Sequence, residues 1–198
     1  MANIEQFNTI ANKYESEQRM ALYKLFNEQL QAINTGGKFL DFGCGTGNLG
    51  ISLSSKFESV YLLDPSTEMR AICEQKILEL GLDNCLVCSQ NLEVGEELEC
   101  TFDTIVIAQV LLHIPDYKLL LSKLVKYLNS NGQLIIFDYV RNEHVQSDIV
   151  HNGFVLEELI EYLQSKGLKY NFDKLIYSDE NFLLGSQGDL FMLSMNKD

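Results

Sequence analysis

Residues 38–50 read KFLDFGCGTGNLG, an apolar run that leads into closely spaced glycines. The run is typical of a buried strand, and Gly43, Gly45 and Gly47 remove side chains where a backbone must turn sharply and come close to a ligand. A helix that begins directly after such a turn directs free N–H groups at the ligand. The stretch therefore predicts a strand, a glycine turn and a helix that together form an anion and nucleotide site.

The spacing of the glycines distinguishes two cofactor classes. Counted from Gly43, the dinucleotide pattern GxGxxG fails at Asn48, although Gly45 begins a match that ends at Gly50. The pattern Asp-x-Gly-x-Gly-x-Gly, counted from Asp41, fits without a shift. A carboxylate ahead of the turn favours a cationic ligand. A dinucleotide, or a glycine turn that binds nothing, is the alternative.

This pattern resembles the first motif of the class I methyltransferases that use S-adenosylmethionine, in which an acidic residue lies two positions before a GxGxG turn. The resemblance implies that Asp41, Gly43, Cys44 and Gly45 belong to the cofactor site. It also implies an α/β fold with a Rossmann-like, doubly wound sheet of seven strands, the last one antiparallel, and helices on both faces.

The next strand, ESVYLLD, ends in Asp64, about twenty residues beyond the turn, where both cofactor classes place an acid on ribose hydroxyls. Asp64, Pro65, Ser66 and Met69 resemble the methyltransferase pattern in which a methionine packs against adenine. Ser66 can also simply cap a helix over residues 67–80, and Met69 can simply fill the core. We therefore expect Asp64, Pro65 and Met69 at the cofactor.

A third strand within NCLVCSQNL ends where the resembling family carries an aspartate that accepts a hydrogen bond from the adenine amino group. This chain has Gln90 and Asn91 there. Asn91 keeps a carbonyl acceptor without the charge. We expect Asn91 and Leu92 to contact the cofactor.

The fourth strand, TFDTIVIAQ, leads into VLLHIPD, which is similar to the family's fourth motif. The resemblance implies that Gln109 and Val110 lie under the methionine end of the cofactor. His113 is a candidate general base for the reaction. Alternatively, His113 packs against its loop and orients it through a hydrogen bond.

The N-terminal segment FNTIANKYESEQR resembles the family's lid. This resemblance implies that Tyr14 covers the methionine moiety and that Lys13 or Arg19 meets the cofactor carboxylate. An amphipathic helix that packs Phe7, Ile10 and Tyr14 on the domain is a compatible alternative. We expect one domain over residues 1–198, with a helical lid over 1–34 and a Rossmann-like core over 35–198.

The remaining pattern alternates strands with helices, which predicts a parallel sheet covered on both faces. Helices are expected near residues 4–16, 18–33, 116–128 and 155–167, and a fifth strand from residue 132. Two final strands near 169–177 and 189–195 resemble the family's closing hairpin. His144 and His151, between the fifth strand and the last helix, are either substrate contacts or ordinary loop groups.

Composition limits the partners. A net charge of −13 and a pI of about 4.6 argue against nucleic acid and against an anionic membrane surface. Five cysteines form no disulfide framework in a chain of this size, and no apolar signal region opens the sequence, so we expect a cytoplasmic protein. Cys85 and Cys88 form a lone CxxC without a second pair, so we expect no metal site and expect the cysteines to be buried thiols.

The sequence thus predicts an S-adenosylmethionine-dependent methyltransferase that transfers a methyl group to a small-molecule acceptor by in-line displacement. The place after the fourth strand reads AQVLLHIPD, without the Asn-Pro-Pro-Tyr motif of family members that methylate amino groups of bases or glutamine. A non-catalytic S-adenosylmethionine-binding subunit and an NAD(P)-dependent oxidoreductase are the alternatives. The acceptor and the oligomeric state stay open.

Overall fold

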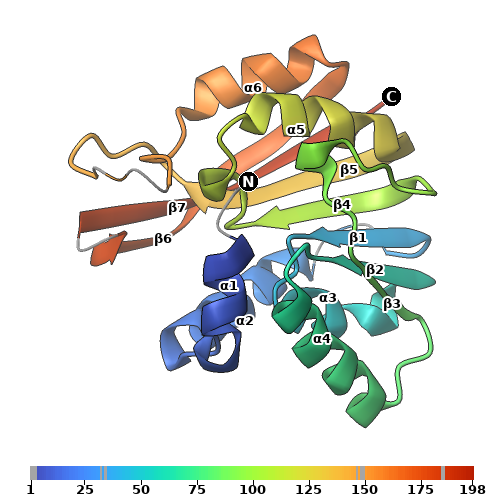
Figure 1. Cartoon of the computed structure of the whole chain (residues 1–198). Coiled ribbons are helices and arrows are strands. Elements are labelled where there is room, and N and C mark those ends of the chain that lie inside the picture. Colours follow the sequence, from blue (N-terminus) through green and yellow to red (C-terminus); the bar gives the residue numbers. More distant parts are fainter. Residues whose placement is uncertain (1–3, 32, 34, 146, 148–149, 184–185) are drawn as a thin grey trace.

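One mixed sheet of seven strands runs through the molecule, in the order β3-β2-β1-β4-β5-β7-β6 (Figure 1). The structure, a computed structural model, describes residues 4–31, 33, 35–145, 147, 150–183 and 186–198. The strands are β1 (Lys38–Phe42), β2 (Ser59–Leu63), β3 (Cys85–Cys88), β4 (Phe102–Ala108), β5 (Leu128–Tyr139), β6 (Leu168–Leu183) and β7 (Ser186–Lys197).

The first five strands are parallel, and the last two form an antiparallel hairpin on β5. β7 lies between β5 and β6, as the expected closing hairpin requires. The chain moves outward from β1 to β3 and then returns to place β4 on the other side of β1. Ligands of open α/β sheets bind outside the carboxyl ends of the strands at such a reversal. The expected fold class is confirmed, and its topology places a site beyond the ends of β1 and β4.

Helices cover both faces of the sheet, and Figure 1 shows the first four on one face and the last two on the other. Their order follows from the parallel connections, because each crossover carries the chain over one face before the next strand. The helices are α1 (Ile4–Ile10), α2 (Glu17–Leu30), α3 (Asn48–Ser52), α4 (Thr67–Leu80), α5 (Tyr117–Leu124) and α6 (Leu156–Ser165).

The core lies along the two central strands. Residues 134–139 of β5 and residues 104–107 of β4 are all buried, as expected of parallel strands that are covered on both sides. Phe26 of α2 stacks on Phe137 of β5 with ring centroids 4.6 Å apart. This contact fixes α2, and with it the N-terminal segment, against the end of the sheet that carries the site.

Most expected elements are present, with differences at their ends. α4 spans the predicted residues 67–80, and Ser66 caps it by accepting a hydrogen bond from the Met69 N–H at 3.3 Å. α5 ends at Leu124, followed by a 3₁₀ turn, rather than at residue 128. β5 begins at Leu128 instead of residue 132, because Leu128 already pairs with Phe102, ahead of a shift in the register between β4 and β5.

Two further differences concern connections. The predicted helix over residues 4–16 ends at Ile10, and a 3₁₀ turn, Ala11–Lys13, follows it. Ser16 then caps α2 by accepting from the Arg19 N–H at 3.3 Å. Between β3 and β4 the alternation lacks a helix and has only the 3₁₀ turn Leu92–Val94, where Gly95 adopts a φ of 92°. This turn borders the site.

The cysteines are only partly as expected. Cys44 and Cys73 are buried, whereas Cys85, Cys88 and Cys100 are partly exposed, so the expectation of buried thiols is wrong for the latter three. Within the described part of the chain, no group of three or more His, Cys, Asp or Glu side chains could hold a metal ion. Over the same residues, no helix has the length and apolar character needed to span a membrane.

Candidate functional site

A pocket opens at the carboxyl ends of β1, β2 and β4, where the strand order reverses. Its cavity volume is about 80 Å³. This first pocket is bounded by the glycine turn, the ends of three strands and the N-terminal segment. Its lining residues are Ile4, Phe7, Tyr14, Phe42, Gly43, Gly45, Leu63, Asp64, Pro65, Met69, Gln90, Asn91, Leu92, Ala108, Gln109, Val110, His113 and Ile114. The predicted site residues line this pocket, except Asp41, Cys44, Lys13 and Arg19.

The glycine turn is held by the neighbouring strand. The N–H groups of Gly43 and Cys44 both donate to the Leu63 carbonyl, at 2.8 and 3.0 Å. Gly43 has a φ of 72°, and a Cβ there would lie 2.4 Å from a Val110 methyl carbon. A side chain at position 43 would therefore strain the backbone and push against the pocket floor.

Asp41 and Cys44 lie behind the pocket rather than in it. The buried Asp41 carboxylate accepts a hydrogen bond from the Gly50 N–H of α3 at 2.9 Å. Burial raises the pKa of Asp41 to about 7, partly offset by that bond, and the nearby Asp64 raises it further. Asp41 thus anchors α3 to β1, and its carboxylate does not face a ligand in this pocket. The Cys44 thiol is buried as well.

Asp64 directly follows β2 and lines the pocket. Its two carboxylate oxygens accept hydrogen bonds from the Gly45 N–H at 2.9 Å and the Ser66 N–H at 2.8 Å. Burial raises the pKa of Asp64, while these two bonds and the Arg70 charge oppose that rise. Each oxygen retains a lone pair for another donor. The carboxylate is therefore fixed in place and still able to accept from ligand hydroxyls.

The third-strand loop offers a second candidate acceptor beside the expected Asn91. The Asn91 side-chain oxygen accepts from the Glu93 N–H at 3.0 Å and so caps the short 3₁₀ turn. The Gln90 Oε1 atom, in contrast, is buried without any hydrogen-bond partner among the described residues. Buried acceptors are nearly always paired, so Gln90 is the residue here that lacks a partner in the absence of a ligand. From the sequence, both Gln90 and Asn91 were candidates, and Asn91 was the expected contact.

The pocket floor carries a strained residue. Gln109 has a φ of 56°, which costs on the order of 1 kcal/mol for a residue with a side chain. Its N–H donates to the Phe137 carbonyl at 2.7 Å, and its amide donates to the Tyr139 hydroxyl at 2.7 Å. These bonds hold the Gln109 side chain across the end of the sheet. A strained residue persists only where surrounding contacts fix it, and such residues cluster at functional sites.

His113 lies beside this floor. Burial and the positive charge of Arg19 lower the pKa of His113 to about 4, so the ring is neutral at pH 7. The Nδ1 atom is buried and has no hydrogen-bond partner among the described residues. The Phe7 ring packs edge-on against the imidazole at 5.2 Å. The expected hydrogen bond that would orient the loop through this ring is therefore not made by Nδ1.

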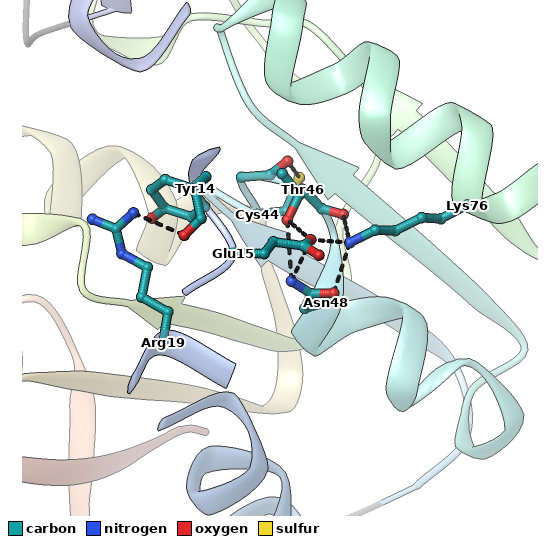
Figure 2. A network of polar contacts seen from close by, with 8 residues as sticks. Tyr14, Glu15, Arg19, Cys44, Thr46, Asn48 and Lys76 are labelled. Carbon is teal, nitrogen blue, oxygen red and sulfur yellow. Dashed lines mark hydrogen bonds and ion pairs between the residues drawn. The ribbon is translucent and has the colours of Figure 1, made fainter. Parts of the chain in front are cut away.

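The N-terminal segment lines the pocket and is held in place by polar contacts (Figure 2). The Glu15 carboxylate accepts hydrogen bonds from Thr46 at 2.6 Å and Asn48 at 2.8 Å, and it pairs with Lys76 of α4. Burial raises the pKa of Glu15, but these bonds outweigh it and the pKa lies below its ordinary value. Nearer the N-terminus, the Asn8 side-chain oxygen accepts a hydrogen bond from the Ser66 hydroxyl at 2.6 Å.

Arg19 lies against Tyr14, away from the Glu15 cluster (Figure 2). The guanidinium carbon is 3.8 Å from the Tyr14 ring centroid, and Nη1 donates to the Tyr14 carbonyl at 3.0 Å. Neither Lys13 nor Arg19 lines the first pocket. The resemblance implies that one of the two, Lys13 or Arg19, meets the carboxylate of the cofactor.

A second cavity, of about 370 Å³, lies on the other side of Tyr14 and was not predicted. It shares Phe7, Tyr14, Gln109 and His113 with the first pocket. Its lining residues are Gln6, Phe7, Ile10, Tyr14, Ser16, Gln18, Arg19, Leu22, Gln109, Leu112, His113, Tyr139 and Val150.

The two loop histidines line neither cavity. His151 is within 2.7 Å of the Ile114 carbonyl through Nε2, and its ring packs edge-on against Tyr117 at 5.5 Å. The His144 N–H donates to the Asn142 side chain at 2.9 Å. For His151, these contacts favour the interpretation of an ordinary loop residue.

Comparison with known proteins agrees with this geometry. The family model described as a methyltransferase domain matches residues 33–190. The chain belongs to the methyltransferase domain family. The resemblance to class I S-adenosylmethionine-dependent methyltransferases that the glycine and Asp64 motifs carry is thereby confirmed.

Curated relatives of this methyltransferase domain are distant and longer. This chain is 26% identical over 181 residues to N-methyltransferase 4 of Papaver somniferum, and the match covers 86% of this chain and 51% of the relative. It is 29% identical over 142 residues to a demethylmenaquinone methyltransferase of Bacillus mycoides, covering 67% of this chain and 60% of the relative. The chain thus spans about half of the first relative and three-fifths of the second.

Solved structures share the fold of the methyltransferase domain over nearly its full length. An S-adenosylmethionine-dependent methyltransferase from Aquifex aeolicus superposes with a TM-score of 0.74 at 18% identity, covering 96% of this chain and 98% of that one. The structure of DhpI with S-adenosylhomocysteine gives a TM-score of 0.72 at 21% identity, covering 98% and 95%. At these identities the likeness concerns the fold.

Proposed function

We propose that this chain is an S-adenosylmethionine-dependent methyltransferase that methylates a small-molecule acceptor. The observation that carries the proposal is the donor and acceptor set of the first pocket. Two polar residues line one cavity beside the close-approach glycines 43 and 45: Asp64, whose carboxylate is fixed, and Gln90, whose buried Oε1 has no hydrogen-bond partner among the described residues. This set suits an adenosine group, which presents ribose hydroxyls and one amino group.

The residues that would hold the cofactor follow from this set. Asp64 accepts from the ribose hydroxyls, and Gln90 accepts from the adenine amino group. Met69 and Leu92 are 1% exposed and provide apolar surface for the adenine ring. Gly43 and Gly45 let the backbone come close to the methionine portion, above Gln109. When bound, S-adenosylmethionine supplies an activated methyl group that a nucleophilic atom of the acceptor takes.

We propose further that residues 1–34 form a lid on a core of residues 35–198, within one domain. The first pocket, at about 80 Å³, is well below the roughly 300 Å³ at the small end of ligand pockets. Ile4, Phe7 and Tyr14 of the N-terminal segment line this pocket. Outward movement of that segment enlarges the pocket, and its return excludes water from the reacting atoms.

His113 is proposed to serve acceptors that must lose a proton. Its ring lines both cavities and is neutral at pH 7, so the unpaired Nδ1 can accept a proton from the acceptor. The low pKa of His113 makes it a weak base. Positioning of the acceptor therefore supplies more of the rate than proton transfer does.

Thermal unfolding with S-adenosylmethionine, S-adenosylhomocysteine or NAD tests the cofactor. A ligand at about a hundred times its dissociation constant adds roughly 2.7 kcal/mol. That raises the Tm of a chain of this size by about 5 to 11 °C. A rise with the adenosyl ligands alone supports the proposal, and a rise with NAD alone would replace it with the oxidoreductase alternative. Adenosyl binding without methyl transfer to any acceptor or partner would indicate a non-catalytic subunit.

The setting of the reaction is proposed from the sequence. The acidic composition favours a small-molecule acceptor over nucleic acid or an anionic membrane surface. The cysteine usage favours the cytoplasm. Fractionation of cells that express a tagged chain tests the location.

A further inference from the structure

We propose that the second cavity binds the methyl acceptor and that Arg19 holds an anionic group of that acceptor, a carboxylate or a phosphate. The inference rests on the proposed methyltransferase function and names the class of its substrate. The cavity volume of about 370 Å³ falls within the range of small-molecule sites. It meets the first pocket at Gln109 and His113, where an acceptor would reach the methyl group.

The charge of the cavity opposes that of the rest of the protein. The chain carries a net charge of −13, yet no Asp or Glu is among the described residues that line the second cavity. Arg19 is the one side chain in that lining that is charged at pH 7, since His113 is neutral there. The field of Arg19 reaches across the cavity, because it contributes, after burial, to the low pKa of His113. The cavity therefore favours an anion.

The Arg19 guanidinium has unused donors. It is partly buried and donates one hydrogen bond, from Nη1 to the Tyr14 carbonyl. None of the ion pairs found among the described residues includes Arg19. A guanidinium carries five N–H donors in a planar fork, and the bond to the Tyr14 carbonyl takes one of them. A carboxylate or phosphate can take two parallel hydrogen bonds from this fork.

Tyr14 separates Arg19 from the first pocket. The guanidinium covers the Tyr14 ring, whose Cε1 atom lies 3.4 Å from where a Gly45 Cβ would be. The Tyr14 ring thus contacts the glycine turn, and the Arg19 guanidinium lies against the same ring in the second cavity. An anion held at Arg19 would extend the rest of its molecule toward Gln109 and Tyr139, which are joined by a hydrogen bond of 2.7 Å. The side of the cavity that Gln109 and Tyr139 form is polar and uncharged, which suits the reacting end of an acceptor.

Anion binding to the protein saturated with S-adenosylhomocysteine tests the proposal. Inorganic phosphate and acetate are titrated at constant ionic strength into wild type, Arg19→Gln and Arg141→Gln. Arg141 is the matched control, because it pairs with Glu158 and lines neither cavity. We expect at least about tenfold weaker anion binding in Arg19→Gln alone. Equal affinities in all three proteins, or no anion binding to wild type, would overturn the proposal. The tighter of the two anions identifies the acceptor group.

A second measurement separates this site from the cofactor site. S-adenosylhomocysteine carries a carboxylate, and 5′-methylthioadenosine does not. If Arg19→Gln weakens S-adenosylhomocysteine about tenfold and leaves 5′-methylthioadenosine unchanged, Arg19 holds the cofactor and the proposal is wrong. If wild type binds neither compound, the methyltransferase function itself fails. Should Arg19→Gln not fold, Arg19→Lys keeps the charge and loses the fork, so we expect a loss of a few-fold in anion affinity; no loss would overturn the proposal.

Discussion

The Asp64 carboxylate accepts a hydrogen bond from the Gly45 N–H at 2.9 Å and joins the end of β2 to the glycine turn that follows β1. A second bond, from the Ser66 N–H at 2.8 Å, joins the same carboxylate to the start of α4. One side chain therefore fixes three segments that border the first pocket. The same carboxylate is proposed to accept from the ribose of the cofactor.

The first prediction follows from this arrangement. Asp64→Asn removes the charge and replaces one acceptor oxygen with a donor, so both the ribose contact and one backbone contact are lost. We expect the dissociation constant of S-adenosylhomocysteine to rise about 10- to 100-fold, as for hydrogen bonds to charged groups. Isothermal titration calorimetry measures it.

Asp83→Asn is the control, because Asp83 follows α4 and lines neither cavity. We expect it to bind S-adenosylhomocysteine as wild type does. Equal affinities for the Asp64 and Asp83 variants would remove Asp64 from the cofactor site.

The second prediction concerns the unpaired Gln90 oxygen. Gln90→Leu removes a buried acceptor that has no hydrogen-bond partner among the described residues, so the Tm of the variant should stay the same or rise. Its affinity for S-adenosylhomocysteine should fall about tenfold, since the amino group of adenine loses its acceptor. Thermal unfolding and calorimetry give the two quantities separately.

Gln133→Leu provides the comparison, because Gln133 also has a buried Oε1 without a partner but lines neither cavity. That variant loses a hydrogen bond of 2.8 Å to Ser194 and should be destabilised with unchanged ligand affinity. The Gln90 assignment would be wrong if the Gln90 variant bound S-adenosylhomocysteine as tightly as wild type.

Much of the fold could be predicted because its signals are local. The apolar runs of β1, β4 and β5, the Ser66 cap and the position of Asp64 at a strand end all follow from neighbouring residues. Strand ends that share one edge of a parallel sheet then bring Asp64, Asn91 and Gln109 to one pocket. These residues were predicted without any knowledge of distant contacts.

The rest depends on contacts that a pattern does not encode. Asp41 belongs to the same motif as the glycines, but its carboxylate is directed at Gly50 and away from the ligand, and the motif alone does not give that direction. The choice between Gln90 and Asn91 depends on which amide caps the 3₁₀ turn. The second cavity arises where Arg19 and Tyr139, 120 positions apart in the sequence, meet through the packing of α2.

The third prediction tests the proposed lid. Glu15→Gln weakens the cluster with Thr46, Asn48 and Lys76 that fastens the N-terminal segment. Because the cluster is partly exposed, we expect only a two- to fivefold faster exchange of the amide hydrogens of residues 4–14, within the usual range for exposed ion pairs. Hydrogen exchange followed by mass spectrometry at pH 7 measures it.

The direction of the pH effect follows from the pKa of Glu15, which is lowered in the folded state. The contribution of the ionised carboxylate is complete above its unfolded pKa of about 4.3 and is lost as the pH falls through the lower folded value. Exchange at pH 7 therefore reports the intact cluster. Glu17→Gln, two residues away in the first turn of α2, should leave the exchange unchanged. Exchange in the Glu15 variant that matches this control would show that the cluster does not hold the segment.

The fourth prediction uses the buried imidazole of His113, whose pKa is lowered from 6.5 to about 4. The unfolded chain binds a proton at this position below about pH 6.5, whereas the folded chain binds it only near pH 4, so His113 destabilises the fold progressively across that window. His113→Gln removes this effect. Relative to wild type, the free energy of unfolding of the variant should increase by up to about 3 kcal/mol between pH 7 and pH 4.

Urea denaturation of both proteins at pH 7, 5.5 and 4 measures this difference. Burial raises the pKa of Asp41 and of Asp138 to about 7, so both affect stability in the opposite direction on acidification. Because both proteins contain these two residues, their contributions cancel in the difference. His144→Gln is the control, because His144 is exposed on its loop and lines neither cavity. If His113→Gln and wild type lost stability in parallel on acidification, the pKa of His113 would be the same in the folded and unfolded chain. Burial would then not lower the pKa of the ring, and the assignment of His113 as a weak base with a depressed pKa would be wrong.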